Sequence, residues 1–112
     1  MDCVFCKIAN GDIPCKKAYE DDRVLAFYDL DPQAPVHILI IPKEHIQSVE
    51  DITEKNSAIV AYIFEVAAKL ARENNLTDGF RVVSNVGKDG GQSVPHLHFH
   101  LLGGRSMKWP PG

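Results

Sequence analysis

Three of the five histidines in this 112-residue chain recur at every second position, as His96, His98 and His100. The residues between them are apolar, so an extended strand would turn the three imidazoles to one face and the apolar side chains to the other. On a helix, positions two apart do not face each other. A free imidazole is about 75% neutral at pH 7 and can attack phosphorus, exchange protons or bind a metal ion. The row therefore predicts a functional site on one face of a strand.

A loop with paired glycines precedes this histidine row. Residues 85–93 read Asn-Val-Gly-Lys-Asp-Gly-Gly-Gln-Ser, which is longer than an ordinary hairpin connection. Glycine adopts positive φ without strain, so successive backbone N–H groups can point inward and bind an anion. A Gly-Gly loop by itself is more often only a turn, but its place before the histidines favours a phosphate site. The expected phosphate-binding residues are Asn85, Gly91, Gln92, Ser93 and Val94.

Two cysteines near the N-terminus are candidate metal ligands. Cys3 and Cys6 have the C-x₂-C spacing that lets one turn offer two thiolates to a tetrahedral ion. A redox pair or two unrelated cysteines would have the same spacing, although nothing nearby suggests the βαβ unit of a thioredoxin-like protein. His45 follows an apolar segment, where on its own it would be a solvated surface residue. With Cys15 the cysteine count is odd, which does not suggest a disulfide framework.

Apolar periodicity predicts the elements that must position these groups. Residues 36–41 are almost wholly apolar, as in a central strand covered on both faces, and His37 is their one polar member. A long segment after a helix cap at Asp51 or Thr53 has apolar side chains at helical spacing. The predicted elements are a short helix at 5–10, strands at 15–20, 23–29 and 36–41, a long helix at 54–75, and strands at 80–85 and 96–102.

These elements predict an α+β fold with an antiparallel five-stranded sheet, one long helix and one short helix. At 112 residues the chain is expected to form one domain, spanning 1–112. A net charge of −3 argues against binding nucleic acid or an anionic membrane through bulk charge. No segment approaches the roughly 18 apolar residues of a membrane span. The N-terminus lacks the basic and apolar regions of a signal peptide, so we expect a cytoplasmic protein.

The segment His96-Leu97-His98-Phe99-His100-Leu101-Leu102 resembles the His-x-His-x-His-x-x signature of the histidine-triad (HIT) superfamily, in which x is apolar. Three further stretches resemble its Hint branch, the histidine-triad nucleotide-binding proteins. They are residues 29–37, residues 89–94 and the terminal Trp-Pro-Pro-Gly at 109–112. The resemblance runs from about Phe5 to the end of the chain and implies the HIT-like version of the α+β fold.

The resemblance also implies a role for each catalytic side chain. His98 matches the family nucleophile, which attacks an α-phosphorus to form a nucleotidyl-histidine that water then cleaves. His100 would donate to the phosphate oxygens. Ser93 would relay a proton to the leaving amine, and His37 would orient the His98 ring.

A nucleoside pocket and a zinc site are implied in the same way. Asp29 matches an acid that holds the ribose, and an apolar set matches the residues that enclose a purine, although core packing is the alternative for Phe27 and Leu30. Some Hint-like proteins carry structural Zn²⁺ on such a cysteine pair and two histidines, which would leave His96 unable to shuttle protons. The purine set is Phe5, Ile8, Ile13, Phe27 and Leu30; the zinc ligands are Cys3, Cys6, His45 and His96.

The activity that the resemblance implies is hydrolysis of purine nucleoside phosphoramidates, such as an AMP or GMP conjugate, by an enzyme of the adenosine 5′-monophosphoramidase type. A dinucleoside polyphosphate hydrolase of the Fhit branch is an alternative, but residues 103–105 (Gly-Gly-Arg) and the terminal 109–112 favour Hint. A nucleotide-binding or partner-binding module with incidental hydrolysis is the other alternative. The family also pairs into homodimers through its long helix and a strand, with the tail, here 107–112, reaching toward the partner's active site.

Overall fold

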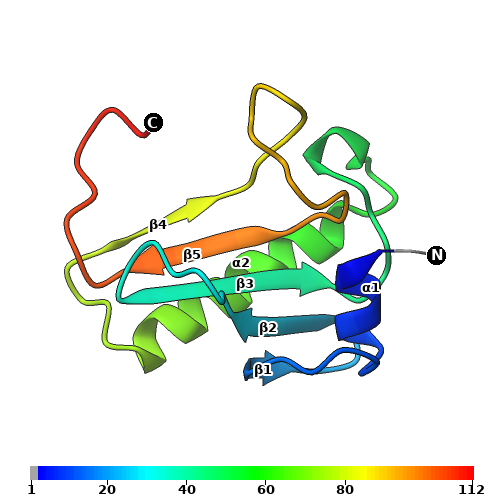
Figure 1. Ribbon diagram of the computed structural model, residues 1–112, viewed down its shortest axis with the longest axis horizontal. Helices are drawn as coiled ribbons and strands as arrows, with labels where there is room; N and C mark the ends of the chain where they lie inside the picture. The colour runs from blue at the N-terminus through cyan, green and yellow to red at the C-terminus, as the bar shows by residue number, and fades with distance from the viewer. Residues whose placement is uncertain (1–2) are drawn as a thin grey trace.

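A computed structural model describes residues 3–112 and shows one antiparallel sheet with a long helix across one face (Figure 1). The strand order is β1-β2-β3-β5-β4. Apart from an added 3₁₀ turn, the predicted α+β fold with five strands, one long helix and one short helix is confirmed. The elements are α1 (Val4–Ala9), β1 (Lys17–Glu20), β2 (Val24–Tyr28), β3 (Val36–Pro42), the 3₁₀ turn η1 (Val49–Asp51), α2 (Ser57–Glu73), β4 (Phe80–Val83) and β5 (Phe99–Gly103).

The two largest differences from the predicted boundaries are at the starts of the long helix and of the last strand. The long helix begins at Ser57, after Asn56, because Asp51 belongs to η1 and the Thr53 hydroxyl accepts the Lys55 N–H in a local turn. The last strand begins at Phe99, so two of the three histidines precede it. The segment of residues 96–98 follows Pro95 and does not join the strand ladder. Instead, the Leu97 N–H donates to the Ile46 carbonyl, in the loop after β3, at 2.6 Å.

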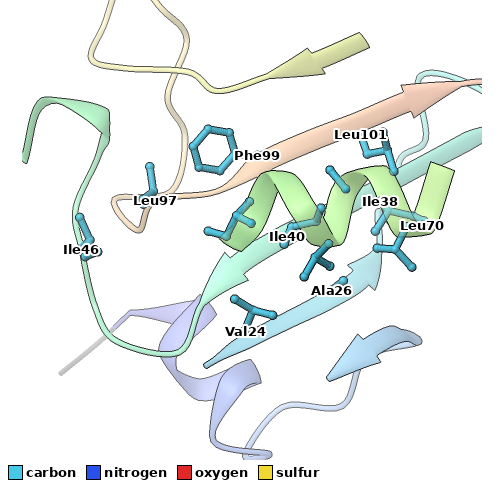
Figure 2. Close-up of a cluster of buried hydrophobic side chains, with 12 residues drawn as sticks. Val24, Ala26, Ile38, Ile40, Ile46, Leu70, Leu97, Phe99 and Leu101 are labelled. Atoms are coloured by element: carbon cyan, nitrogen blue, oxygen red, sulfur yellow. The ribbon is translucent and has the colours of Figure 1, made fainter. Parts of the chain in front are cut away.

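The apolar side chains form two layers, one on each face of the sheet. Alternate residues of β2 and β3 enter each layer, so these central strands are buried on both sides. Leu97, Phe99 and Leu101 alternate with the histidines and pack in the layer under α2 (Figure 2), as the alternation predicted. On the opposite face, Phe5 of α1 packs with Phe27 in a smaller cluster. The histidine side of β5 therefore shares its face of the sheet with α1.

The turn between β1 and β2 is fixed to α2 by one carboxylate. Asp21 accepts hydrogen bonds from the hydroxyls of Tyr19 and Tyr62 and from the N–H groups of Arg23 and Val24. Burial by itself would raise the pKa of Asp21, but these four donors outweigh it and hold the pKa well below its usual range. Within residues 3–112, no helix is both long and apolar enough to cross a bilayer.

We predict that Asp21→Asn destabilises the fold more at pH 7 than at about pH 3. The folded-state pKa lies below the unfolded value of about 3.9, so the carboxylate stabilises the wild type above that value, and the stabilisation is lost as the pH falls toward the folded-state pKa. Urea unfolding of both proteins at the two pH values measures the difference. A stability difference that is the same at both would contradict an ionised Asp21 at the centre of this cluster.

Candidate functional site

The histidine row lies where β5 begins, on the face of the sheet that carries α1. His96 and His98 are 0% and 5% exposed, and His100 is half-buried on β5 itself. The Phe5 ring meets the His98 ring edge-on, with centroids 5.1 Å apart, and lies 6.0 Å from the His96 ring. The short helix α1 therefore fixes the two imidazoles that the strand ladder itself does not hold.

The protonation of the His98 ring follows from a single contact. His98 Nδ1 lies 2.7 Å from the backbone carbonyl oxygen of His96. A carbonyl oxygen only accepts, so Nδ1 carries the proton and donates it. In the neutral ring the lone pair is then at Nε2. This is the nitrogen available to attack an electrophile.

A chain of hydrogen bonds sets the other two rings of the site. The backbone N–H of Gln33 donates to His37 Nδ1 at 3.0 Å, so in neutral His37 the proton is on Nε2. That N–H donates to His100 Nδ1 at 2.9 Å. Neutral His100 must then carry its own proton on Nε2. The chain thus makes His100 a hydrogen-bond donor through its remaining nitrogen.

Burial keeps this chain uncharged. It lowers the pKa of His37, and the Asp29 and Asp31 carboxylates only partly offset the effect. Burial, together with the neighbouring His98 and His37 rings, lowers the pKa of His100 to about 4. Both rings are therefore neutral at pH 7. The sequence predicted that His37 orients His98, but the ring that it hydrogen-bonds is that of His100, because residues 37 and 100 lie on the adjacent strands β3 and β5.

Four side chains with metal-ligand chemistry meet beside the His98 ring, and all four were predicted as zinc ligands. Tetrahedral Zn²⁺ with its usual bond lengths to sulfur and nitrogen places neighbouring ligand atoms about 3.3 to 3.8 Å apart. Cys3 Sγ lies 3.2 Å from His96 Nδ1, and Cys6 Sγ lies 3.2 Å from His45 Nδ1 and 3.5 Å from His96 Nδ1. The two Nδ1 atoms are 3.2 Å apart. The residues therefore fit a tetrahedral zinc site.

The groups around these ligands favour the same conclusion. His96 Nε2 donates to the Pro42 carbonyl at 2.9 Å, which leaves the lone pair on Nδ1, the atom that faces the cysteines. The Cys6 N–H donates to Cys3 Sγ at 3.3 Å, a bond that favours a thiolate. Burial and the adjacent Cys3 raise the pKa of the Cys6 thiol, so a cation is required to hold it ionised.

A second group, Asp29, His37 and His100, also has metal-ligand spacing. Asp29 Oδ2 lies 3.5 Å from His37 Nε2, and its Oδ1 accepts the Asp31 N–H at 2.8 Å. Here the tautomer opposes a metal, because the Gln33 N–H keeps the lone pair of His37 on Nδ1 and a proton on the nitrogen that would ligate. The two groups have similar distances between their ligand atoms. The group of Cys3, Cys6, His45 and His96 fits a metal ion, whereas Asp29, His37 and His100 form a chain of hydrogen bonds.

Two polar side chains of the glycine loop hydrogen-bond backbone groups, Asn85 within the loop and Gln92 also outside it. Asn85 Nδ2 donates to the Gly90 carbonyl at 2.6 Å, and Gln92 Nε2 donates to the carbonyls of Gln47 and Val94. A Cβ on Gly90 would lie 2.2 Å from the Val86 carbonyl oxygen, so only glycine fits there. Asn85 and Gln92 shape the predicted phosphate loop, while Ser93 is exposed and Val94 half-buried.

The predicted purine residues divide into core and surface. Phe5 and Phe27 are buried, with ring centroids 5.6 Å apart, so core packing accounts for Phe27. Leu30 is fully exposed, and core packing is wrong for it. Ile8 and Ile13 are half-buried. The backbone partners of the rings, the carbonyl of Pro42 and the N–H of Gln33, were not predicted from the sequence, because no residue type marks a main-chain hydrogen bond.

Comparison with known proteins gives consistent matches. The family model described as "HIT domain" matches residues 10–107. A 14 kDa zinc-binding protein from Zea mays is 50% identical over 97% of this chain and 87% of its own length. The crystal structure of a HIT family hydrolase from Legionella pneumophila is 52% identical, with a TM-score of 0.97 over 99% of this chain and 100% of its own. A histidine triad protein from Clostridium difficile is 57% identical, with a TM-score of 0.92 over 98% and 95%.

Proposed function

Because the chain belongs to the HIT domain family, we propose that it is a hydrolase of the Hint type that cleaves purine nucleoside phosphoramidates. Two solved structures with similar sequences are named HIT family hydrolases, which supports the reaction class. The observation that carries the proposal is that two neighbouring rings are set in complementary tautomers. His98 has a lone pair at Nε2, and His100 has an uncharged N–H donor at Nε2.

The reaction proceeds in two displacements. His98 Nε2 attacks the α-phosphorus, the bond from phosphorus to the leaving nitrogen breaks, and the amine takes a proton, with Ser93 as its relay. The nucleotidyl ring formed on His98 gains positive charge. Its Nδ1–H already donates to the His96 carbonyl, so that charge strengthens an existing hydrogen bond. Water then cleaves the bond from phosphorus to His98 and releases the mononucleotide.

Neutral donors balance the developing negative charge on the phosphate. His100 Nε2–H is one of them, and the backbone N–H groups of Ser93 and Val94 are the others. The predicted N–H groups of Gly91 and Gln92 already donate to the carbonyls of Lys88 and Gly87. A pKa of about 4 keeps His100 from protonating at physiological pH, so it donates without becoming a charged acid. Asp29, at the end of β2, would accept the ribose hydroxyls beside it. The exposed Leu30 and the half-buried Ile8 and Ile13 would enclose the base of AMP or GMP.

We further propose structural Zn²⁺ on Cys3, Cys6, His45 and His96. The ligand-atom distances and the orientation of His96 by Pro42 support it, as does the name of the zinc-binding maize relative. When bound, the ion would supply no chemistry to the substrate; it would hold α1 against the loop that precedes β5. The proton traffic of the reaction would then fall to His98, His100 and Ser93.

A homodimer is proposed as the functional assembly. Strand β4 forms one edge of the sheet, and its Phe80 is 46% exposed. Phe64 on α2 is 48% exposed, and Trp109 in the C-terminal tail is 81% exposed. An unpaired strand edge with aromatic side chains around it is the kind of surface that a second copy covers.

We expect wild-type protein to hydrolyse adenosine or guanosine phosphoramidates and His98→Ala to lose about 1,000-fold or more in kcat while still binding AMP. Quenching in alkaline denaturant should trap a nucleotidyl adduct on His98, detected as a mass increase, because the bond between phosphorus and an imidazole nitrogen is labile in acid. The same assays with a dinucleoside polyphosphate distinguish the alternatives. Faster turnover of that substrate would favour the Fhit-type reaction, and nucleotide binding without turnover would favour a binding module. Near wild-type rates in His98→Ala would refute the nucleophile.

We expect about one zinc per chain by elemental analysis of protein purified without chelator. Cys3→Ser and His45→Ala should lose the metal and melt at lower temperature, because the ion cross-links α1 to the loops before α2 and β5. Cys15→Ser is the matched control, since Cys15 lies outside the cluster, and it should keep its zinc. Metal-free protein in which the thiols of Cys3 and Cys6 react freely would exclude the site and return His96 to catalysis.

Sedimentation at micromolar concentration should show a dimer, and Phe80→Asp should shift it to monomer by placing a charge on the β4 edge. Leu30→Asp places the same charge on an exposed side chain outside α2 and β4, and it should remain dimeric. A wild type that sediments only as monomer would refute the assembly. A chain lacking residues 107–112 that keeps wild-type substrate preference would refute a role for the tail.

A further inference from the structure

A guanidinium far along the chain holds the loop beside the candidate active site. Arg105 donates from Nε at 3.0 Å and from Nη2 at 2.9 Å to the backbone carbonyl of Gln33. Arg105 follows the last strand, and Gln33 lies in the loop between β2 and β3. Both segments lie at the same end of the sheet (Figure 1). A charged donor that gives two hydrogen bonds to one carbonyl is a strong and directional contact.

A second contact brings the same two segments together. Gly104 has a φ of 92°, and a Cβ built on it would lie 2.9 Å from Pro35 Cβ. Only glycine combines this backbone conformation with so close an approach to the loop. Gly104 and Arg105 therefore act on both sides of Ala34, one by close packing and one by hydrogen bonding.

The anchored residue is the one that sets the tautomer of His37. Gln33 offers its carbonyl to Arg105 and its N–H to His37 Nδ1. Its side-chain Nε2 also donates to the Asp31 carbonyl at 3.0 Å, and the Asp31 N–H donates to Asp29 Oδ1. These local bonds curl the loop but do not attach it to the sheet. The attachment comes from Arg105 and Gly104.

We propose that Arg105 is a positioning residue of the active site: by anchoring Gln33 it keeps the proton of His37 on Nε2 and so keeps His100 a donor toward the substrate. The anchoring of Gln33 by Arg105, and of His37 by Gln33, is argued from the hydrogen bonds described above. Only its last step, the effect on turnover, rests on the proposed phosphoramidate hydrolysis. Arg105 touches no reacting atom and acts through three successive residues.

Loss of the anchor would expose His37 to protonation. Three groups besides Gln33 face its ring: the carboxylates of Asp29 and Asp31, which favour a charged imidazolium, and the His100 ring, which accepts from Nε2. The Gln33 N–H opposes protonation because it occupies Nδ1 as a donor. When that N–H drifts away, Nδ1 can hold a proton. A neutral His37 with its proton on Nδ1 accepts at Nε2, so His100 then donates from Nδ1 and no longer carries a proton on Nε2. The imidazolium, which still donates from Nε2, also forms at a higher pH than before.

The direct test is the tautomer of His37 in ¹⁵N-labelled protein without substrate. Long-range ¹H–¹⁵N spectra of the wild type should show a proton on Nε2 and none on Nδ1. In Arg105→Gln, His37 should titrate roughly half to one pH unit higher, the shift expected for one lost hydrogen bond. Gly104→Ala should shift it in the same direction without a change of charge, and Arg105→Lys, with one compact donor, should restore part of the wild-type behaviour.

Steady-state kinetics with an adenosine phosphoramidate test the catalytic consequence. Both kcat and kcat/KM at pH 7 should fall several-fold in Arg105→Gln, because neutral His37 rings with their proton on Nδ1 leave His100 without a proton on Nε2. Arg72→Gln, which removes an exposed arginine from the last turn of α2, is the matched control and should leave both unchanged. Circular dichroism of each variant verifies that the sheet is intact.

The outcomes separate the two proposals. Unchanged His37 spectra in Arg105→Gln would overturn the anchor, even if activity fell, because a fall alone would mean that Arg105 touches the substrate. Changed His37 spectra with unchanged kcat and kcat/KM would overturn the catalytic consequence. A wild type that hydrolyses no phosphoramidate would refute the proposed function, while the spectra would still decide whether Arg105 holds the tautomer.

Discussion

A main-chain group at one nitrogen of each of three buried imidazoles decides what the other nitrogen can do. The Pro42 carbonyl leaves His96 Nδ1 with a lone pair, and the His96 carbonyl does the same for His98 Nε2. The Gln33 N–H has the opposite effect on His37, whose free nitrogen becomes a donor. One residue type thereby presents two nitrogen lone pairs, at His96 and His98, and one N–H donor, at His37, within a small volume.

These contacts require a rigid frame, because a hydrogen bond fixes a tautomer only while its length and direction persist. Strands β3 and β5 are adjacent, β3 is packed by apolar layers on both faces and β5 by the layer under α2, which holds His37 against His100. Phe5 closes the open side of His98 from α1. Burial adds a second effect, since it lowers the pKa of His37 and His100 and so prevents the charged forms, in which both nitrogens would donate.

The sequence predicted the architecture because apolar periodicity determines it. Alternation alone predicted that Leu97, Phe99 and Leu101 face the core and the histidines the other side, and the structure shows that α2 covers this core layer. The spacing of the Cys3 and Cys6 pair suggested a metal site, but only the family resemblance pointed to His45 and His96. The start of β5 and the partner of His37 were wrong, since both depend on which backbone groups meet across the sheet. No pattern of residue types could reveal the part played by the carbonyl of Pro42.

Residue 96 contacts two neighbouring groups of residues, one through its side chain and the other through its backbone. Its imidazole belongs to the cysteine and histidine cluster, whereas its contact with the His98 ring is made by its carbonyl, a group that every amino acid possesses. The orientation of the His98 ring therefore does not depend on which side chain residue 96 carries. Related chains can replace the cysteines and histidines of the cluster by apolar core residues one at a time. The carbonyl of residue 96 would still orient the His98 ring at every step. The cysteine and histidine cluster and the catalytic histidines can therefore change independently during evolution, although residue 96 contacts both.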